Sequence, residues 1–261
     1  MNIDKVDLGF ELRSWSTGAV DLRERADLLR RMYSTLLEKH GDKDDARCSS
    51  FAKTINVLDS SIDMCHMILG CFNDASWWER RHGKLPEKEL KIKVAQGLVR
   101  QSRVFSFFLI SGFHSVIESS LRVLIRAIYP KGESQVEMGV AEFWKVRKRL
   151  LQEDLELQNV DKYTQALKGL SLYRNTSHNN GLFFPPNMKK DSFKWGNDTY
   201  EFIPKEMPPQ LDWPVLLSLI DVLSEMLCSI VEHEKIRNIK HMIDPFGVKE
   251  RNVQEKAGRP C

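Results

Sequence analysis

The chain has 261 residues, of which 42% are hydrophobic and 29% are charged. These fractions are ordinary for a water-soluble globular protein with a sizeable core, and they exclude a low-complexity chain. The net charge of +3 is too small to require nucleic acid as a partner, and it does not exclude one.

Cysteine usage and the N-terminal residues indicate the compartment. Five cysteines are scattered through the chain without a CxxC pair. The first residues lack the basic, apolar and small-residue order of a secretory signal. An odd number of cysteines without such a signal is typical of free thiols in a reducing cytosol. We therefore expect a cytoplasmic protein.

The first half of the chain is dominated by helical periodicity. Residues 1–20 contain two glycines and no sustained pattern, so we expect an irregular N-terminal arm there. Apolar residues then recur at spacings of three and four over 21–40, 46–72 and 87–129, which predicts three helices. The stretch 104–128 is apolar on nearly all sides, as in a central, buried helix.

Shorter elements follow in the second half. Helical patterns over 140–153 and 161–178 precede a change to alternation at 192–203, where a Gly-Asn-Asp turn predicts a small β-hairpin. A last helix is expected over 213–242. The polar segment 244–261 has no core-forming pattern, so we expect a disordered tail.

Together these elements predict an all-α fold. No repeat or linker interrupts the chain, so we expect a single domain over 21–243. Several amphipathic helices can bury their stripes only against one another, which favours a helical bundle with the hairpin inserted before the last helix. The longest apolar run, 104–117, is shorter than the ~20 residues needed to span a bilayer, so we expect no membrane association.

Polar groups gather in the sequence SLYRNTSHNNG, at the end of a helical pattern. Arg174 and His178 are four residues apart and therefore share a helical face, with Asn175 and Asn179 beside them. One interpretation is a helix end, where basic side chains offset the dipole and asparagines satisfy the last carbonyls. The other is phosphate chemistry, because an imidazole can transfer protons and a guanidinium can hold a phosphate through two hydrogen bonds.

A basic cluster lies in the helix expected over 140–153. Lys145, Arg147, Lys148 and Arg149 follow one another closely and could contact an RNA backbone. The alternative is a solvated helix face, since such charges are spread round the helix.

Signals for cofactors are missing. The chain has no glycine-rich nucleotide loop, no HExxH motif and no GxSxG elbow. Cys65, His66 and Cys71 lack the second ligand pair of a structural zinc site. We expect neither a metal nor another cofactor.

The order of a buried helix, RNTSHNNG, the hairpin FKWGNDTYEF and a long final helix resembles the HEPN superfamily. The resemblance covers roughly residues 104–242. It implies an all-α bundle that usually dimerises and that in many members is a metal-independent ribonuclease of prokaryotic toxin–antitoxin or anti-phage defence systems. RNA would be the substrate, and a second copy of the chain and an antitoxin or defence protein would be the partners.

The resemblance also implies roles for individual residues. Arg174 would stabilise phosphate charge, His178 would be the acid–base group and Asn175 would orient them. Glu118, on the preceding core helix, would support the motif, with Asn179 as a further supporting residue. Only three residues separate Arg174 from His178, one fewer than is usual in the family. An alternative is therefore a non-catalytic HEPN-like module that binds RNA or another protein.

Overall fold

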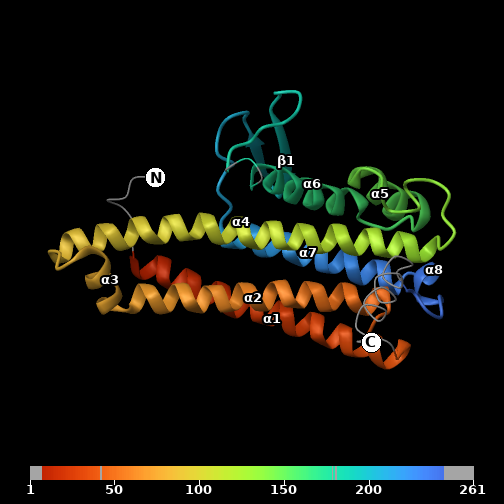
Figure 1. The fold of residues 1–261 in the computed structure, drawn as a ribbon, viewed down its shortest axis with the longest axis horizontal. Helices are drawn as coiled ribbons and strands as arrows, with labels where there is room; N and C mark the ends of the chain where they lie inside the picture. The colour runs from red at the N-terminus through yellow and green to blue at the C-terminus, as the bar shows by residue number, and fades with distance from the viewer. Residues whose placement is uncertain (1–7, 42, 178, 180, 244–261) are drawn as a thin grey trace, which may run out of the picture.

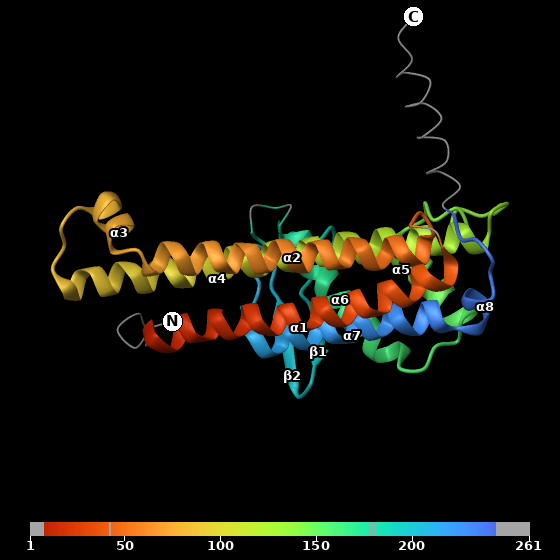
Figure 2. The ribbon, with the colours of Figure 1, turned by 90° about the horizontal axis from the view of Figure 1, so that it is seen from below.

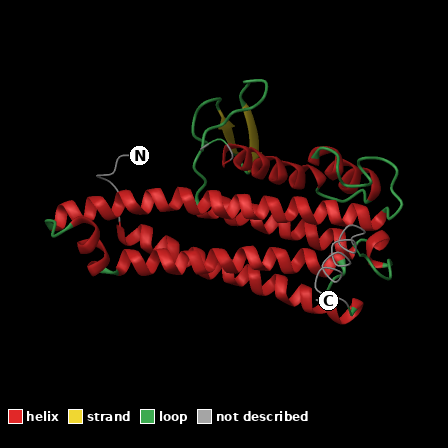
Figure 3. Cartoon of the chain, viewed as in Figure 1, coloured by secondary structure: helices red, strands yellow, loops and turns green. Residues whose placement is uncertain are grey.

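The computed structural model describes residues 8–41, 43–177, 179 and 181–243. The expected disordered tail over 244–261 lies outside these residues. The described part is mostly helical, with one two-stranded antiparallel hairpin before the last long helix (Figure 3), so the all-α class with an inserted hairpin is confirmed. The elements are α1 Leu8–His40, α2 Ala46–Asn73, α3 Ala75–His82, α4 Glu87–Ile128, α5 Phe143–Lys148, the π-helical turn η2 Arg149–Asp154, α6 Val160–Ser177, β1 Asp191–Trp195, β2 Asp198–Phe202, α7 Trp213–Glu232 and α8 Glu234–Arg237.

Four long helices form the body of the molecule. α1, α2, α4 and α7 run lengthwise and pack against one another around a single hydrophobic core (Figures 1 and 2). α6 packs on α4 and α7, and the hairpin packs on α6, so both lie on the side of the bundle away from α1 and α2 (Figure 1). The end of α6, where the polar motif lies, is therefore outside the four-helix core but in contact with it.

The first helix is longer than the sequence predicts. α1 begins at Leu8, so the irregular arm expected over 1–20 is wrong from that residue onward. Trp15 is 1% exposed, and its ring meets that of Trp213 edge-on with centroids 5.6 Å apart. Gly18 lies inside this helix and allows α7 to come close. A Cβ there would lie 2.8 Å from the same Trp213 ring. Packing against α7 thus extends the helix toward the N-terminus.

The central helix agrees with its prediction. α4 is a continuous helix of 42 residues with Phe113, Ile117 and Leu121 in the core. Gly97 and Gly112 sit inside it where neighbours come close. A Cβ would lie 3.0 Å from Trp78 at the first position and 3.3 Å from a side chain of α2 at the second. Both glycines therefore allow close packing within an unbroken helix.

Two predicted helices differ in length from those in the structure. The helix expected over 140–153 begins at Phe143 and passes into η2. The helix expected over 213–242 ends at Glu232, because His233 adopts extended backbone angles, φ −59° and ψ 137°, and caps the short α8. This break turns the chain back toward the start of α2.

A buried ion pair holds that returning segment. Asp45 and Arg47, at the start of α2, are 1% and 0% exposed and lie 2.6 Å apart between Oδ2 and Nη2. Arg47 also donates to the carbonyls of Ile236 and Ile239, both at 3.0 Å. Asp45 accepts from the backbone N–H of Met242 at 3.1 Å. The pair thereby fastens the segment after α7 to the opposite end of the sequence.

The hairpin forms one wall beside the motif. Trp195 pairs with Asp198 across a two-residue turn that begins with Gly196 at φ 59°. Phe193, on β1, is 1% exposed and packs on α6 at Gly169, where a Cβ would lie 2.9 Å from its ring. This contact fixes the hairpin against the middle of α6.

Two helices, α4 and α7, are long and apolar enough to cross a membrane by length and composition alone. In their apolar windows, 44% and 56% of the residues are buried inside the protein, and core helices of water-soluble proteins satisfy the same criterion. The expectations of a cytoplasmic protein and of no membrane association stay predictions.

Candidate functional site

The motif and its proposed support meet where α6 packs on α4. Arg174, in the last turn of α6, places Nη1 3.6 Å from Oε2 of Glu118 on α4, and the two side chains are 38% and 17% exposed. The structure therefore brings together two residues that the resemblance singles out. His178 lies outside the described residues.

Glu118 is held in place from its other side. Arg122, one turn further along α4, donates from Nε and Nη2 to Oε1 of Glu118 at 3.1 and 2.7 Å. Nη1 of the same guanidinium donates to the carbonyls of Gly139 and Ala141 at 2.6 and 2.7 Å. Arg122 thus orients the carboxylate and fastens the segment before α5, while Oε2 of Glu118 faces Arg174.

A buried histidine lies behind this pair. His114 is 2% exposed, and its Nε2 lies 3.0 Å from Oγ of Ser171 on α6. Ser171 lies 2.8 Å from the carbonyl of Leu167, to which it donates, and this favours the tautomer in which Nε2 carries the imidazole proton and donates to Ser171. The Nδ1 atom lies 3.6 Å from Oε2 of Glu118, and it has no hydrogen-bond partner in the described part of the chain.

Charge and burial keep this histidine neutral. Burial lowers the pKa of His114 to about 4, although the carboxylate of Glu118 raises it. Arg174, Arg147 and Arg122 lower that pKa further through their positive charge. Two guanidinium groups, those of Arg122 and Arg174, therefore share the carboxylate of Glu118 beside this histidine. Because the Arg174 side chain is 38% exposed, an anion can approach it from solvent.

His114 could not be singled out from the sequence, because it falls inside the apolar run 104–117 and has the character of a core residue. A signal was present nonetheless. His114, Glu118 and Arg122 follow one another at intervals of four, which places a polar row on one face of an otherwise apolar helix. Such a row needs partners from another element, and α6 supplies them with Ser171 and Arg174.

The basic cluster of α5 and η2 divides in two: Lys145, Lys148 and Arg149 line one cavity of about 340 Å³, and Arg147 does not. Arg147 is half-buried, its burial lowers its pKa, and its charge acts on His114. The other three basic residues are paired with acidic side chains: Lys145 with Glu142 at 2.8 Å, Lys148 with Glu153 at 3.1 Å and Arg149 with Asp154 at 2.9 Å. An RNA phosphate would have to compete with these carboxylates.

Asn175 and Asn179 face a different direction from Arg174. They line a cavity of about 430 Å³ between the end of α6 and the loop before β1. Nδ2 of Asn179, just past the end of α6, donates to the backbone carbonyl of Asn175 at 2.9 Å. The motif therefore presents its arginine toward α4 and its asparagines toward this cavity.

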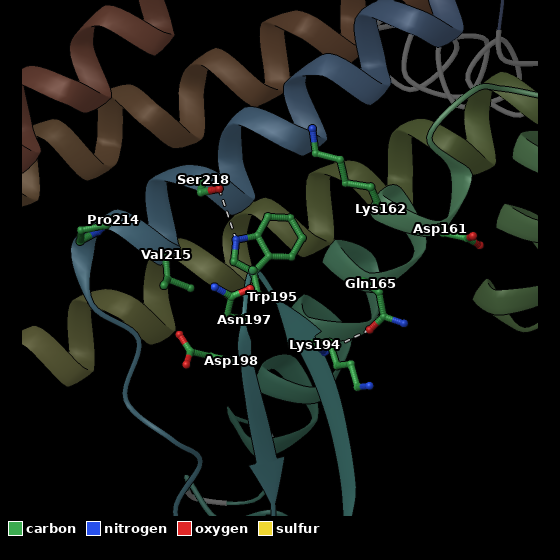
Figure 4. A pocket seen from close by; sticks show the side chains of 11 residues that line it. Asp161, Lys162, Gln165, Lys194, Trp195, Asn197, Asp198, Pro214, Val215 and Ser218 are labelled. Carbon is green, nitrogen blue, oxygen red and sulfur yellow. Dashed lines mark hydrogen bonds between the residues drawn. The ribbon is translucent and has the colours of Figure 1, made fainter.

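A larger cavity, of about 640 Å³, lies between the hairpin turn, α6 and α7 (Figure 4). Figure 4 shows its internal hydrogen bonds: Trp195 Nε1 donates to Ser218 Oγ at 3.3 Å, and the backbone N–H of Lys194 donates to Gln165 Oε1 at 3.2 Å. None of the residues expected from the sequence to form a site lines it.

The side chains that could hold a metal do not assemble in the described part of the chain. Over residues 8–41, 43–177, 179 and 181–243, no group of three or more His, Cys, Asp or Glu has a suitable arrangement. Cys65 is buried among apolar side chains, and burial raises its pKa to about 12.

No protein-family model matches the chain, and searches of curated proteins and of solved structures find no significant match. The resemblance to the HEPN superfamily therefore stays a prediction from the residues and their order.

Proposed function

We propose that the chain is a metal-independent endoribonuclease of HEPN-like type whose active residues are Arg174 and His178. The observation that carries the proposal is the setting of Arg174. Its guanidinium is 38% exposed, lies 3.6 Å from the carboxylate of Glu118, and shares that carboxylate with Arg122, which orients it. A guanidinium placed in this way can receive a phosphate while its support remains in the protein.

The proposed reaction is an attack of the ribose 2′-hydroxyl on the adjacent phosphate. His178 takes the 2′-hydroxyl proton, and the bond between phosphorus and the 5′ oxygen breaks. The leaving oxygen receives a proton from the imidazolium of His178 or from water, so the products are a 2′,3′-cyclic phosphate and a 5′-hydroxyl end. Arg174 stabilises the negative charge that builds on the phosphoryl oxygens. A second copy of the chain and a toxin–antitoxin or defence partner belong to the same proposal.

The test is cleavage of end-labelled RNA by the full chain in the presence of EDTA. Arg174→Ala and His178→Ala should each lower the rate by about 100-fold or more. Arg174→Lys should also be impaired, since lysine keeps the charge but lacks the planar fork. Arg80→Ala, on the exposed surface of α3 with its side chain 68% exposed, is the matched control and should cleave normally. Cleavage that EDTA abolishes, or that persists in both active-residue variants, would refute the proposal.

A second candidate is a non-catalytic module that binds RNA or another protein. It is favoured by the ion pair itself, because Glu118 already neutralises Arg174, and by the short spacing between Arg174 and His178. This candidate predicts binding of RNA or of a partner protein with no cleavage at any protein concentration. The assay above separates the two, because cleavage lost on Arg174→Ala fits only the enzyme.

A further inference from the structure

The cavity between the end of α6 and the loop before β1 is lined by amides, an aromatic ring and a lysine. The end of α6 contributes two amides, Asn175 and Asn179, and the following loop contributes a third, Asn187. The loop also contributes the ring of Phe184, which is 42% exposed. Lys189 lines it next to β1. Its volume of about 430 Å³ falls within the range of ~300–1,000 Å³ that is usual for small-molecule sites.

The loop that carries Phe184 is fixed by its neighbours. Phe183 is 2% exposed and its ring meets that of Phe202 at 5.5 Å between centroids. The backbone of Phe183 is bonded in both directions to the segment before α7, donating to Glu206 at 2.9 Å and accepting from Lys205 at 2.8 Å. Since Phe183 points into the core, the next side chain along the loop is held outward. Phe184 is therefore an aromatic surface in a defined position.

The polar groups of the cavity suit a nucleobase. A carboxamide offers a donor and an acceptor side by side, which matches the N6 amino group and N7 of adenine. Nδ2 of Asn179 is engaged by the carbonyl of Asn175, and Oδ1 of Asn187 accepts from the backbone N–H of Lys189 at 3.0 Å, so both amides are oriented. An exposed aromatic ring adds a stacking surface, which any base can use.

The charge balance of the cavity suits the strand that carries the base. Asp191 is the acidic residue of the lining, and Lys168 neutralises it at 2.7 Å. Lys190 is paired with Glu201 at 3.3 Å. Lys189 is then the cation best suited to a backbone phosphate.

We propose that this cavity is a base-binding subsite for single-stranded RNA, with the base stacked on Phe184 and its edge read by the asparagine amides. The inference rests on the proposed function, since it places the base next to the phosphate that Arg174 would receive. Asn175 and Arg174 are consecutive on α6, so one helix turn would serve both the base and the phosphate.

The test is binding of a short 2′-O-methyl oligoadenylate, measured by fluorescence anisotropy with the full chain. This probe cannot be cleaved, because its attacking hydroxyl is blocked, so binding is measured independently of catalysis. A strand of equal length without bases reports the phosphate contribution alone. Phe184→Ala and Phe184→Leu should weaken oligoadenylate binding by about five-fold or more and leave binding of the abasic strand unchanged. Lys189→Ala should weaken binding of both strands.

Two matched variants serve as controls. Met67→Ala removes a 64% exposed apolar side chain from α2, and Lys84→Ala removes a 92% exposed lysine side chain before α4. Neither should change binding of either strand. The subsite is refuted if wild type does not bind oligoadenylate, if Phe184→Leu binds it as wild type does, or if Phe184→Ala weakens both strands equally.

Cleavage of ordinary RNA by Arg174→Ala separates this inference from the proposed function. Cleavage that continues in Arg174→Ala, together with weakened oligoadenylate binding in the Phe184 variants, refutes the proposed active residues and supports the base-binding cavity. Cleavage lost in Arg174→Ala, together with unchanged binding in the Phe184 variants, supports the nuclease and refutes the cavity.

Discussion

Two clusters of charge in the described part of the chain, one fully and one partly buried, are built in opposite ways. In the first, each oxygen of Asp45 accepts hydrogen bonds, and the guanidinium of Arg47 is shared between that carboxylate and two backbone carbonyls. In the second, Glu118 contacts two guanidinium groups, those of Arg122 and Arg174, and lies beside a histidine whose Nδ1 lacks a hydrogen-bond partner in the described part of the chain. We call the first cluster closed, because its charged atoms are hydrogen-bonded within the protein. We call the second incomplete, because a buried ring nitrogen in it lacks such a bond.

The difference separates a structural role from a functional one. A charge pair whose hydrogen bonds are all used within the protein can fasten two segments, and it offers nothing to a ligand. A cluster with excess positive charge and a half-exposed arginine can still gain a partner. We therefore assign Asp45 and Arg47 to stability and the Glu118 cluster to the site. Four substitutions test the contrast.

The largest effect is expected at the closed pair. Arg47→Leu should lower the free energy of unfolding by about 3–5 kcal/mol, because it leaves the buried carboxylate of Asp45 without a counter-charge. Urea denaturation followed by circular dichroism measures the loss. Lys91→Ala removes one partner of an exposed pair on α4, with side chains 65% and 80% exposed, and should have no measurable effect. Equal effects of the two substitutions would contradict the structural role of Arg47.

The second effect depends on pH. The pKa of His114 falls from an ordinary 6.5 to about 4 in the folded protein, so the unfolded chain binds a proton first as the pH decreases. Its contribution to stability is complete above pH 6.5 and is lost as the pH falls toward 4. Between those values the wild type should lose about 3 kcal/mol more than His114→Gln. Urea denaturation across the interval checks this, and parallel curves for the two proteins would refute it.

A smaller effect is expected from neutralising the carboxylate of the incomplete cluster. Glu118→Gln keeps an acceptor for Arg122 but removes the charge that opposes the guanidinium groups of Arg122 and Arg174, and should destabilise the fold by about 1–3 kcal/mol. The same change should make the cluster a better anion site, so added inorganic phosphate should raise the melting temperature of the variant more than that of wild type. A smaller phosphate effect in the variant would argue against excess positive charge.

The smallest effect concerns the hydrogen bond behind the site. Ser171→Ala removes the acceptor of His114 Nε2–H and should destabilise the protein by only about 1 kcal/mol. The imidazole can move its proton to Nδ1, which faces Glu118 at 3.6 Å, and so recover an interaction. Nitrogen chemical shifts of the ring should report the changed tautomer. An unchanged tautomer would show that Ser171 does not set it.

Much of the fold could be predicted because its signals are local. The helix α2 starts and ends where its apolar stripe does, and the hairpin follows from alternation around a Gly-Asn turn. The start of α1 could not be predicted, because the role of Gly18 depends on Trp213, a distant residue in the sequence. The sequence alone does not distinguish a glycine that allows a close contact from one that ends a helix.

Some residues of the candidate site could be predicted from the sequence, and others depend on tertiary packing. Arg174 and Glu118 could be nominated from the motif and the order of the helices, and the structure brings them together. His114 and the inward turn of Arg147 could not, because both depend on how α5 and α6 pack against α4. The cavity lined by Asn175 and Asn179 requires the loop before β1, whose path no periodicity describes.

The closed pair also affects the order in which the chain can complete its fold during synthesis. Met242 lies 197 residues after Asp45, whose carboxylate accepts its N–H, and Arg47 must likewise wait for the carbonyls of Ile236 and Ile239. On the ribosome, the start of α2 therefore emerges long before its hydrogen-bond partners. Until they arrive, the hydrogen bonds that fasten this end of the bundle cannot form.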